Sequence, residues 1–147
     1  MRVAVLNGPN LNLLGRREPE LYGTESLADI ERVVRDRAKA AGVEVDWRQT
    51  NDEGQFIEQV QALPASAQGA LVNAAAFTHT SMAIRDALLA VRIPFVEVHL
   101  SNIFAREPER RRSLLADLAV GVIAGFGSMS YLLALDALVA HLRRRAT

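Results

Sequence analysis

Cysteine is absent from this chain of 147 residues. Its absence excludes disulfide bonds and metal sites that are built from thiolates. Lysine occurs once, as Lys39, in a stretch that has helical periodicity. A mechanism that needs a buried amine or a Schiff base therefore has almost no place in this protein.

Aromatic residues make up only 5% of a chain that is 50% hydrophobic, so the core must be mainly aliphatic. No apolar run reaches the ~20 residues that a membrane-spanning helix needs. The 17 basic and 17 acidic residues cancel, which gives no electrostatic reason to expect nucleic acid or an anionic membrane as a partner. Because an apolar strand pattern begins at residue 2, we expect no signal peptide and a cytoplasmic protein.

Short apolar strands alternate with helical patterns along the whole chain. This alternation predicts a single α/β domain over residues 1–147, with a flavodoxin-like parallel sheet of five strands and helices on both faces. The expected strands are residues 2–6, 43–49, 70–73, 95–99 and 119–124. The expected helices are residues 26–41, a second one stopped by Pro64, a third one reaching about Val91, and residues 131–144.

The helix that follows the first loop has clear end signals. Ser26 and Asp29 have the spacing of a capping box, and Gly42 is placed to end the helix as its C′ residue. Residues 43–49 alternate apolar and polar side chains, which is typical of a half-buried or edge strand.

Residues 7–22 form an unusually long connection between a strand and a helix, because such loops typically hold about 2–6 residues. The segment contains three Asn, two adjacent Arg and one Tyr. Long polar loops at the carboxyl end of a strand are where α/β proteins place binding and catalysis. A guanidinium near Tyr22 would favour the phenolate and lower the pKa of the phenol, so Tyr22 and an arginine of the same loop form a candidate base.

Polar side chains also follow the next three expected strands. Because the carboxyl ends of parallel strands meet at one edge of a sheet, we expect a functional site at that edge. The residues involved, in chain order, are Asn7, Asn10, Arg16, Arg17, Tyr22, Asn51, Asp52, Glu53, Asn73, Thr78, His79, Thr80, His99, Ser101 and Asn102, and the loop after the fourth strand adds Arg106, Arg110, Arg111 and Arg112.

The common cofactor motifs do not account for this edge. The first loop lacks the Lys of a phosphate-binding loop, and Gly125-x-Gly127 is a weak match to a dinucleotide fingerprint, which comes after the wrong strand. His79 and His99 have no obvious third metal ligand. We therefore expect no metal and no cofactor. Two other classes remain open: a non-catalytic module that binds a small anion or a protein partner, and a carrier of flavin or nucleotide.

Several long motifs resemble the type II 3-dehydroquinate dehydratases, in the same order and over nearly the whole chain. The motifs are Asn7-Gly-Pro-Asn-Leu-Asn-Leu-Leu-Gly15, Arg17-Glu-Pro19, Tyr22-Gly23, Gln49-Thr-Asn-Asp-Glu-Gly54, Asn73-Ala-Ala-Ala-Phe-Thr-His-Thr-Ser81, Ile84-Arg-Asp86, Val96-Glu-Val-His-Leu-Ser-Asn-Ile103 and Tyr131-Leu-Leu-Ala-Leu135. The resemblance implies a cofactor-independent hydro-lyase that converts 3-dehydroquinate to 3-dehydroshikimate through an enolate. It also implies a place in the shikimate or quinate pathway, and thus in aromatic amino acid biosynthesis, and an assembly of trimers into a dodecamer.

The resemblance also implies residue roles, position by position. Tyr22 matches the general base with Arg17 beside it, His99 the acid, and Asn10 the residue that holds an enolate-stabilising water. Matches to substrate-binding positions are Asn73, His79, Leu100, Ser101 and Arg110, and Asp86 matches a position that reaches a neighbouring subunit's site. From its place two residues before His99 we expect Glu97 to contact that histidine. His79 has a second role open to it, as a cap of the third expected helix.

Five positions differ from the family pattern. They are Asp52, Glu109, Asp117, Val120 and Ser130, where His, an aromatic residue, Pro, Thr and Gly are common. None of them removes an expected catalytic group. Because they change the surroundings of those groups, the alternative function within this family is a paralogue with weak or no activity.

Overall fold

The computed structural model describes residues 1–16 and 18–147, with the backbone but not the side chains of residues 21 and 22. Five strands form one sheet in the order β2-β1-β3-β4-β5, and every pair of neighbours is parallel. Their bounds are β1 (Arg2–Asn7), β2 (Glu44–Gln49), β3 (Gly69–Asn73), β4 (Phe95–His99) and β5 (Gly121–Ala124). This is the strand order of flavodoxin-like folds, so the predicted architecture is confirmed.

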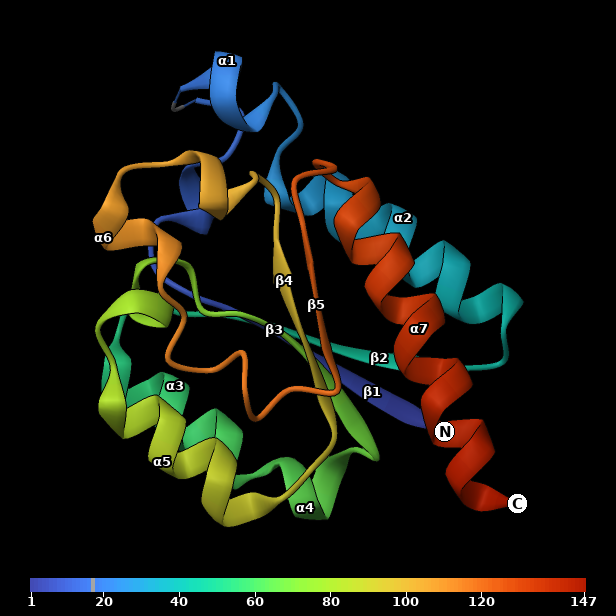
Figure 1. The fold of residues 1–147 in the computed structure, drawn as a ribbon. Helices are drawn as coiled ribbons and strands as arrows, with labels where there is room; N and C mark the ends of the chain where they lie inside the picture. Colours follow the sequence, from blue (N-terminus) through green and yellow to red (C-terminus); the bar gives the residue numbers. More distant parts are fainter. Residues whose placement is uncertain (17) are drawn as a thin grey trace.

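Long helices cover both faces of the sheet. On one face α2 (Leu27–Ala40) packs beside α7 (Met129–Ala146), and on the other α3 (Glu53–Gln61) packs beside α5 (Met82–Val91) (Figure 1). Among the described residues, no helix combines the length and the apolar character needed to cross a bilayer.

The core consists of two layers, one on each side of the sheet. Val3 and Val5 of β1 face α2 and α7, whereas Ala4 and Leu6 face the layer that contains α3 and α5. Successive residues of a strand point to opposite faces, and both faces are buried here, so β1 and β3 contain continuous apolar runs. Burying one large aliphatic side chain contributes about 1.5–3 kcal/mol. The sheet is therefore a rigid support for the side chains at its carboxyl edge.

The helix ends predicted from sequence are present. Ser26 Oγ accepts from the N–H of Asp29 at 3.1 Å, and Asp29 Oδ2 accepts from the N–H of Ser26 at 3.0 Å. These hydrogen bonds lower the pKa of Asp29 below its usual value. Gly42 follows the C-cap residue Ala41, in the predicted C′ position, with φ 72°. The alternating strand β2 lies at the edge of the sheet and is largely half-buried, as predicted.

Three short helices lie where the sequence predicted loops or a helix end. They are α1 (Pro19–Tyr22), α4 (Leu63–Ser66) and α6 (Pro108–Arg111), and each has Pro at one of its first two positions. The prediction that Pro64 stops the second helix was wrong, since α3 ends at Gln61 and Pro64 helps to begin α4. Proline fits the first turn because the N–H it lacks has no partner there.

The remaining differences are small shifts of bounds and three single turns. β5 begins at Gly121 rather than at residue 119, and α7 begins at Met129 rather than at residue 131. The turns η1 (Leu11–Leu13), η2 (Ala75–His79) and η3 (Ile103–Ala105) follow β1, β3 and β4. These turns fix the backbone conformation at the start of each loop on the carboxyl edge of the sheet.

Gly8 brings the first loop into contact with the end of β3. Its N–H donates to the carbonyl of Asn73 at 2.8 Å, and a Cβ at this position would lie 2.3 Å from the carbonyl oxygen of Ala74. No side chain fits at that distance, so only glycine allows the two loops to approach this closely.

The variant Gly8→Ala is expected to lower the free energy of unfolding by about 1–3 kcal/mol, because the clash involves backbone that cannot move aside. The matched control is Gly121→Ala, since a Cβ at Gly121 has nothing within 4 Å. Urea denaturation of both variants measures the difference. Equal stability of the two would mean that the close approach is not required.

Candidate active site

A pocket opens at the carboxyl ends of β1, β3 and β4. It is lined by loop residues that follow each of these strands, and β1 and β3 flank the point where the strand order reverses. Ligands of open α/β sheets bind at such a switch point. The structure brings together these residues that the sequence singled out: Asn10, Asn73, His79, His99, Leu100, Ser101 and Arg110.

Among the described residues with a predicted site role, Asp86 and Glu97 do not line the pocket. Asp86 is exposed on α5. Arg17 and the side chain of Tyr22 lie outside the described residues. The helix α1, which contains the backbone of Tyr22, lies beyond the carboxyl edge of the sheet (Figure 1).

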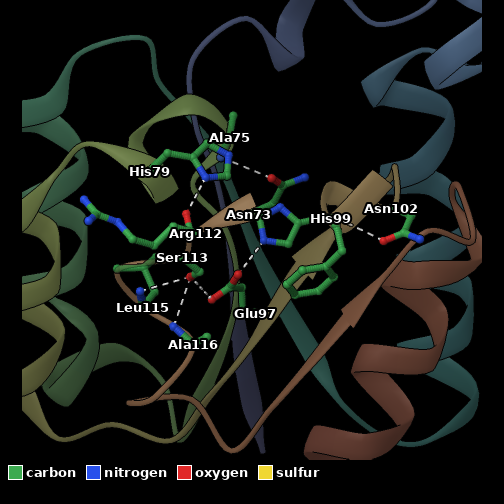
Figure 2. A network of polar contacts seen from close by, with 11 residues as sticks. Asn73, Ala75, His79, Glu97, His99, Asn102, Arg112, Ser113, Leu115 and Ala116 are labelled. Carbon is green, nitrogen blue, oxygen red and sulfur yellow. Dashed lines mark hydrogen bonds and ion pairs between the residues drawn. The ribbon is translucent and has the colours of Figure 1, made fainter. Parts of the chain in front are cut away.

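Glu97 and His99 form a buried pair at the end of β4. Glu97 is fully buried and His99 is 5% exposed, and His99 Nε2 lies 2.5 Å from Glu97 Oε2. Ser113 Oγ donates to the other carboxyl oxygen, Oε1, at 2.7 Å (Figure 2). A buried carboxyl group is costly without hydrogen bonds, and here each oxygen has one. The contact fixes the plane of the His99 ring.

His79 lies beside this pair. Its ring stacks on that of His99 with a centroid distance of 6.5 Å and an interplanar angle of 20°. Its Nδ1 lies 2.7 Å from the carbonyl oxygen of Arg112, which can only accept, so Nδ1 carries a proton (Figure 2). Desolvation by burial lowers the pKa of His79, and the hydrogen bond to Arg112 opposes that shift. The ring is therefore neutral at pH 7, with its Nε2 lone pair available.

The expectation that His79 caps the third helix was wrong. The N-cap of α5 is Ser81, whose hydroxyl accepts from the N–H of Ile84 at 2.9 Å. His79 lies two residues earlier, in η2, where its ring nitrogen is engaged by Arg112 instead.

The lowered pKa of His79 has a consequence for stability. In the unfolded chain this histidine takes up a proton near its usual pKa of 6.5, whereas the folded protein resists protonation until a lower pH. The unfolded state then binds more protons, so the free energy of unfolding falls as the pH falls below about 6.5.

His79→Gln removes this contribution, so its stability is expected to fall less than that of the wild type between about pH 7 and about pH 5. Denaturant titrations over this range measure the difference. His141→Gln, which removes a histidine from α7, serves as the control. Parallel pH dependence of wild type and His79→Gln would contradict the assignment.

A second buried network lies under the pocket. Asn73 Nδ2 donates to the hydroxyl of Tyr131 at 2.8 Å, the hydroxyl donates to Asn7 Oδ1 at 2.7 Å, and Asn7 Nδ2 donates to the carbonyl of Arg48 at 2.9 Å. Burial raises the pKa of Tyr131, so its phenol stays neutral and can both donate and accept. The network orients the side chain of Asn73 at the floor of the pocket.

Arginine side chains form one wall. Arg106 donates to Ser101 Oγ at 3.3 Å, and Glu107 lies in ion-pair contact with Arg110. Hydrogen bonds from its own backbone and from Arg110 lower the pKa of Glu107. Arg106 and Arg110 both line the pocket, so an anionic group would be favoured there.

Four residues of these networks had no role assigned to them from the sequence: Asn7, Arg106, Ser113 and Tyr131. Asn7 and Arg106 had been noted only as polar residues after strands. The motif that begins at Tyr131 pointed to this residue without indicating a role. Nothing in the sequence around Ser113 indicates its contact with Glu97.

Three of the five positions that depart from the family pattern make local hydrogen bonds or ion pairs. Asp52 caps α3 by accepting from the N–H of Gln55 at 2.8 Å. Ser130 Oγ accepts from the N–H of Phe126 at 3.0 Å. Asp117 pairs with Arg85 at 2.5 and 3.0 Å. Glu109 and Val120 are exposed, and no contact explains either residue.

Within residues 1–16 and 18–147, no group of three or more His, Cys, Asp or Glu side chains could hold a metal ion. The expectation that the protein needs no metal stays a prediction.

The fold and the pocket define an α/β protein with a buried histidine–carboxyl pair at the carboxyl edge of a flavodoxin-like sheet. The model of the family described as "Dehydroquinase class II" matches residues 1–139. The chain therefore belongs to the class II dehydroquinase family, and it is an enzyme of the lyase class.

Individual relatives agree with this assignment. The chain is 58% identical over 144 residues to the 3-dehydroquinate dehydratase of Parasynechococcus marenigrum (strain WH8102), covering 98% of this chain and 99% of that protein. It is 59% identical over 143 residues to that of Synechococcus sp. (strain WH7803), covering 97% of each. The crystal structure of the type II dehydroquinase of Butyrivibrio crossotus is 40% identical with a TM-score of 0.91, covering 94% of this chain and 97% of that one.

Proposed function

We propose that this protein converts 3-dehydroquinate to 3-dehydroshikimate by eliminating water through an enolate. Elimination from a β-hydroxy ketone requires a base for the hydrogen next to the carbonyl, a stabiliser for the enolate and an acid for the departing hydroxyl. The observation that carries the proposal is the buried Glu97–His99 pair, whose histidine lines a pocket that also presents arginine and asparagine side chains.

His99 is the acid in this mechanism. With Nε2 held by Glu97 at 2.5 Å, the ring nitrogen that remains for the substrate is Nδ1. A carboxyl group behind a histidine sets the orientation and tautomer of the ring and stabilises its protonated form. His99 can therefore carry a proton to the hydroxyl that leaves.

Tyr22 is the base, with Arg17 as the group that makes it basic. A phenol ordinarily ionises near pH ~10, and a guanidinium beside its oxygen favours the charged form. If the pKa of the phenol is lowered by about two to three units, the phenolate is preferentially stabilised by roughly 3–4 kcal/mol. The position of α1 beyond the carboxyl edge of the sheet supports this assignment.

The other residues bind the substrate. Arg110 offers the fork geometry that suits the substrate carboxylate, and Asn10 holds the water that stabilises the enolate. Asn73, His79, Leu100 and Ser101 contribute the remaining contacts from around the same pocket. Neutral His79 can accept a hydrogen bond from a substrate hydroxyl through Nε2.

We also propose an oligomeric state, a cellular location and a pathway for this enzyme. We expect trimers that pack into a dodecamer, in which Asp86 reaches the site of a neighbouring subunit; its exposed position on α5 supports that role. We also expect a cytoplasmic enzyme of the shikimate or quinate pathway. Light scattering on the purified protein tests the assembly, which should have twelve times the mass of one 16.1 kDa chain.

The test of the function is direct. Purified protein, treated with EDTA and given no cofactor, should convert 3-dehydroquinate into a product with the ultraviolet absorbance of a conjugated ketone. His141→Gln serves as the matched control for the histidine variants, since His141 lies on α7 and is not among the pocket residues. Binding of 3-dehydroquinate without any turnover would favour the non-catalytic module instead.

A further inference from the structure

We propose that Ser113 is a positioning residue, whose hydroxyl holds Glu97 so that Glu97 can hold His99. The inference rests on the proposed function, because it assigns Ser113 to the acid of that reaction. Ser113 lies 16 residues from Glu97 in the sequence and comes from the segment that follows α6.

The direction of the hydrogen bond follows from the other partners of the hydroxyl. Ser113 Oγ accepts from the N–H groups of Leu115 and Ala116, both at 3.0 Å (Figure 2). A hydroxyl has two lone pairs and one hydrogen. Both lone pairs are therefore in use, and the hydrogen is left for Glu97 Oε1 at 2.7 Å.

This arrangement determines how Glu97 meets His99. With Oε1 held as an acceptor by Ser113, Oε2 is the oxygen that faces His99 Nε2. Glu97 is fully buried, so an oxygen without a hydrogen bond would be costly there. Loss of the Ser113 hydroxyl would therefore favour a rotated carboxyl group and a displaced His99 ring.

The segment that contains Ser113 is anchored independently of Glu97. The N–H of Leu114 donates to the carbonyl of Thr78 at 2.9 Å, and Arg85 donates to the carbonyl of Leu114 at 2.8 Å. Arg85 also pairs with Asp117 further along the same segment. These contacts hold Ser113 in place from α5 and η2, so Ser113 positions Glu97 and not the reverse.

The preceding residue acts on the neighbouring histidine. The carbonyl of Arg112 holds His79 Nδ1 at 2.7 Å, and His79 stacks on His99. Residues 112 and 113 together therefore orient both imidazole rings, one through the backbone and one through a hydroxyl and a carboxyl group.

The first test separates positioning from support of the fold. Ser113→Ala is expected to lower kcat by about 10- to 100-fold, the usual cost of removing a group that orients a functional side chain, with KM changed by less than about 3-fold. Ser113→Thr keeps the hydroxyl and should recover most of the lost kcat. Ser66→Ala, which changes a half-buried serine on α4 outside the pocket, is the control and should retain wild-type kcat.

The second test is a double-mutant cycle. If Ser113 acts through Glu97, then Ser113→Ala should cost nothing further in a Glu97→Gln background. Losses that add in the double variant, or a Ser113→Ala enzyme within about 2-fold of wild-type kcat, would overturn the positioning role while leaving the proposed function intact. Absence of turnover by the wild type would instead overturn the proposed function, and the positioning role with it.

Discussion

His99→Gln is expected to lower kcat for 3-dehydroquinate by about 10²–10⁴-fold, which is the usual contribution of a positioned general acid. The amide of Gln can occupy part of the imidazole site, but it cannot carry a proton to the departing hydroxyl. The substrate contacts proposed for Asn73, Ser101 and Arg110 would remain, so KM should change little. Steady-state kinetics followed by product absorbance measure both constants.

The prediction for His99 has a clear control. His141→Gln makes the same chemical change on α7, outside the pocket, and should keep wild-type kcat. A His99→Gln enzyme that turns over at a rate similar to this control would exclude His99 as the acid.

Tyr22→Phe is expected to remove turnover almost entirely, by about 10²–10⁴-fold or more in kcat, while substrate affinity stays largely intact. The ring is retained, and only the oxygen that would take the hydrogen is lost. Kinetics and calorimetric binding of 3-dehydroquinate measure the two effects separately. A Tyr22→Phe enzyme with near-normal kcat would exclude Tyr22 as the base.

The small number of tyrosines makes the ionisation of Tyr22 observable. The chain has only two, and burial raises the pKa of the other one, Tyr131. Phenolate absorbance that develops below pH ~10 can therefore be assigned to Tyr22, and it should be missing from Tyr22→Phe. If wild type and variant titrate alike below that pH, Arg17 does not activate the phenol.

The fold was predictable from sequence where burial repeats with a regular period. Ile30, Val34 and Ala38 of α2 recur at helical spacing and are all buried, and β3 is a continuous apolar run with both faces covered. The strand order was predictable as well, because alternation of strand and helix allows few arrangements of five parallel strands.

The short helices were not predictable in the same way. A helix of four residues is too short to show a periodic pattern, so α1 and α6 were predicted as loops and α4 as a helix end. One signal was available, because Pro19, Pro64 and Pro108 each lie in the first turn of such a helix. Pro64 was interpreted as the end of a helix, whereas it lies in the first turn of one.

The candidate site was partly predictable. The sequence predicted that four polar residues would lie close together, because each lies at or just after the end of a strand of the same sheet. The structure places all four around one pocket: Asn10, Asn73, His79 and His99. The supporting contacts could not be foreseen. Ser113 meets Glu97 only because of the path of the segment after α6, which no local pattern encodes.

The central claim, that one residue takes the hydrogen and another releases the hydroxyl, is tested most directly with His99→Gln in deuterated water. If Tyr22 is the base and His99 the acid, this variant should still form the enolate and exchange the hydrogen beside the carbonyl for deuterium, while eliminating almost no water. Proton NMR of the recovered 3-dehydroquinate would show the exchange above the rate without enzyme. No exchange above that rate, or elimination at the wild-type rate, would contradict the division of labour between Tyr22 and His99.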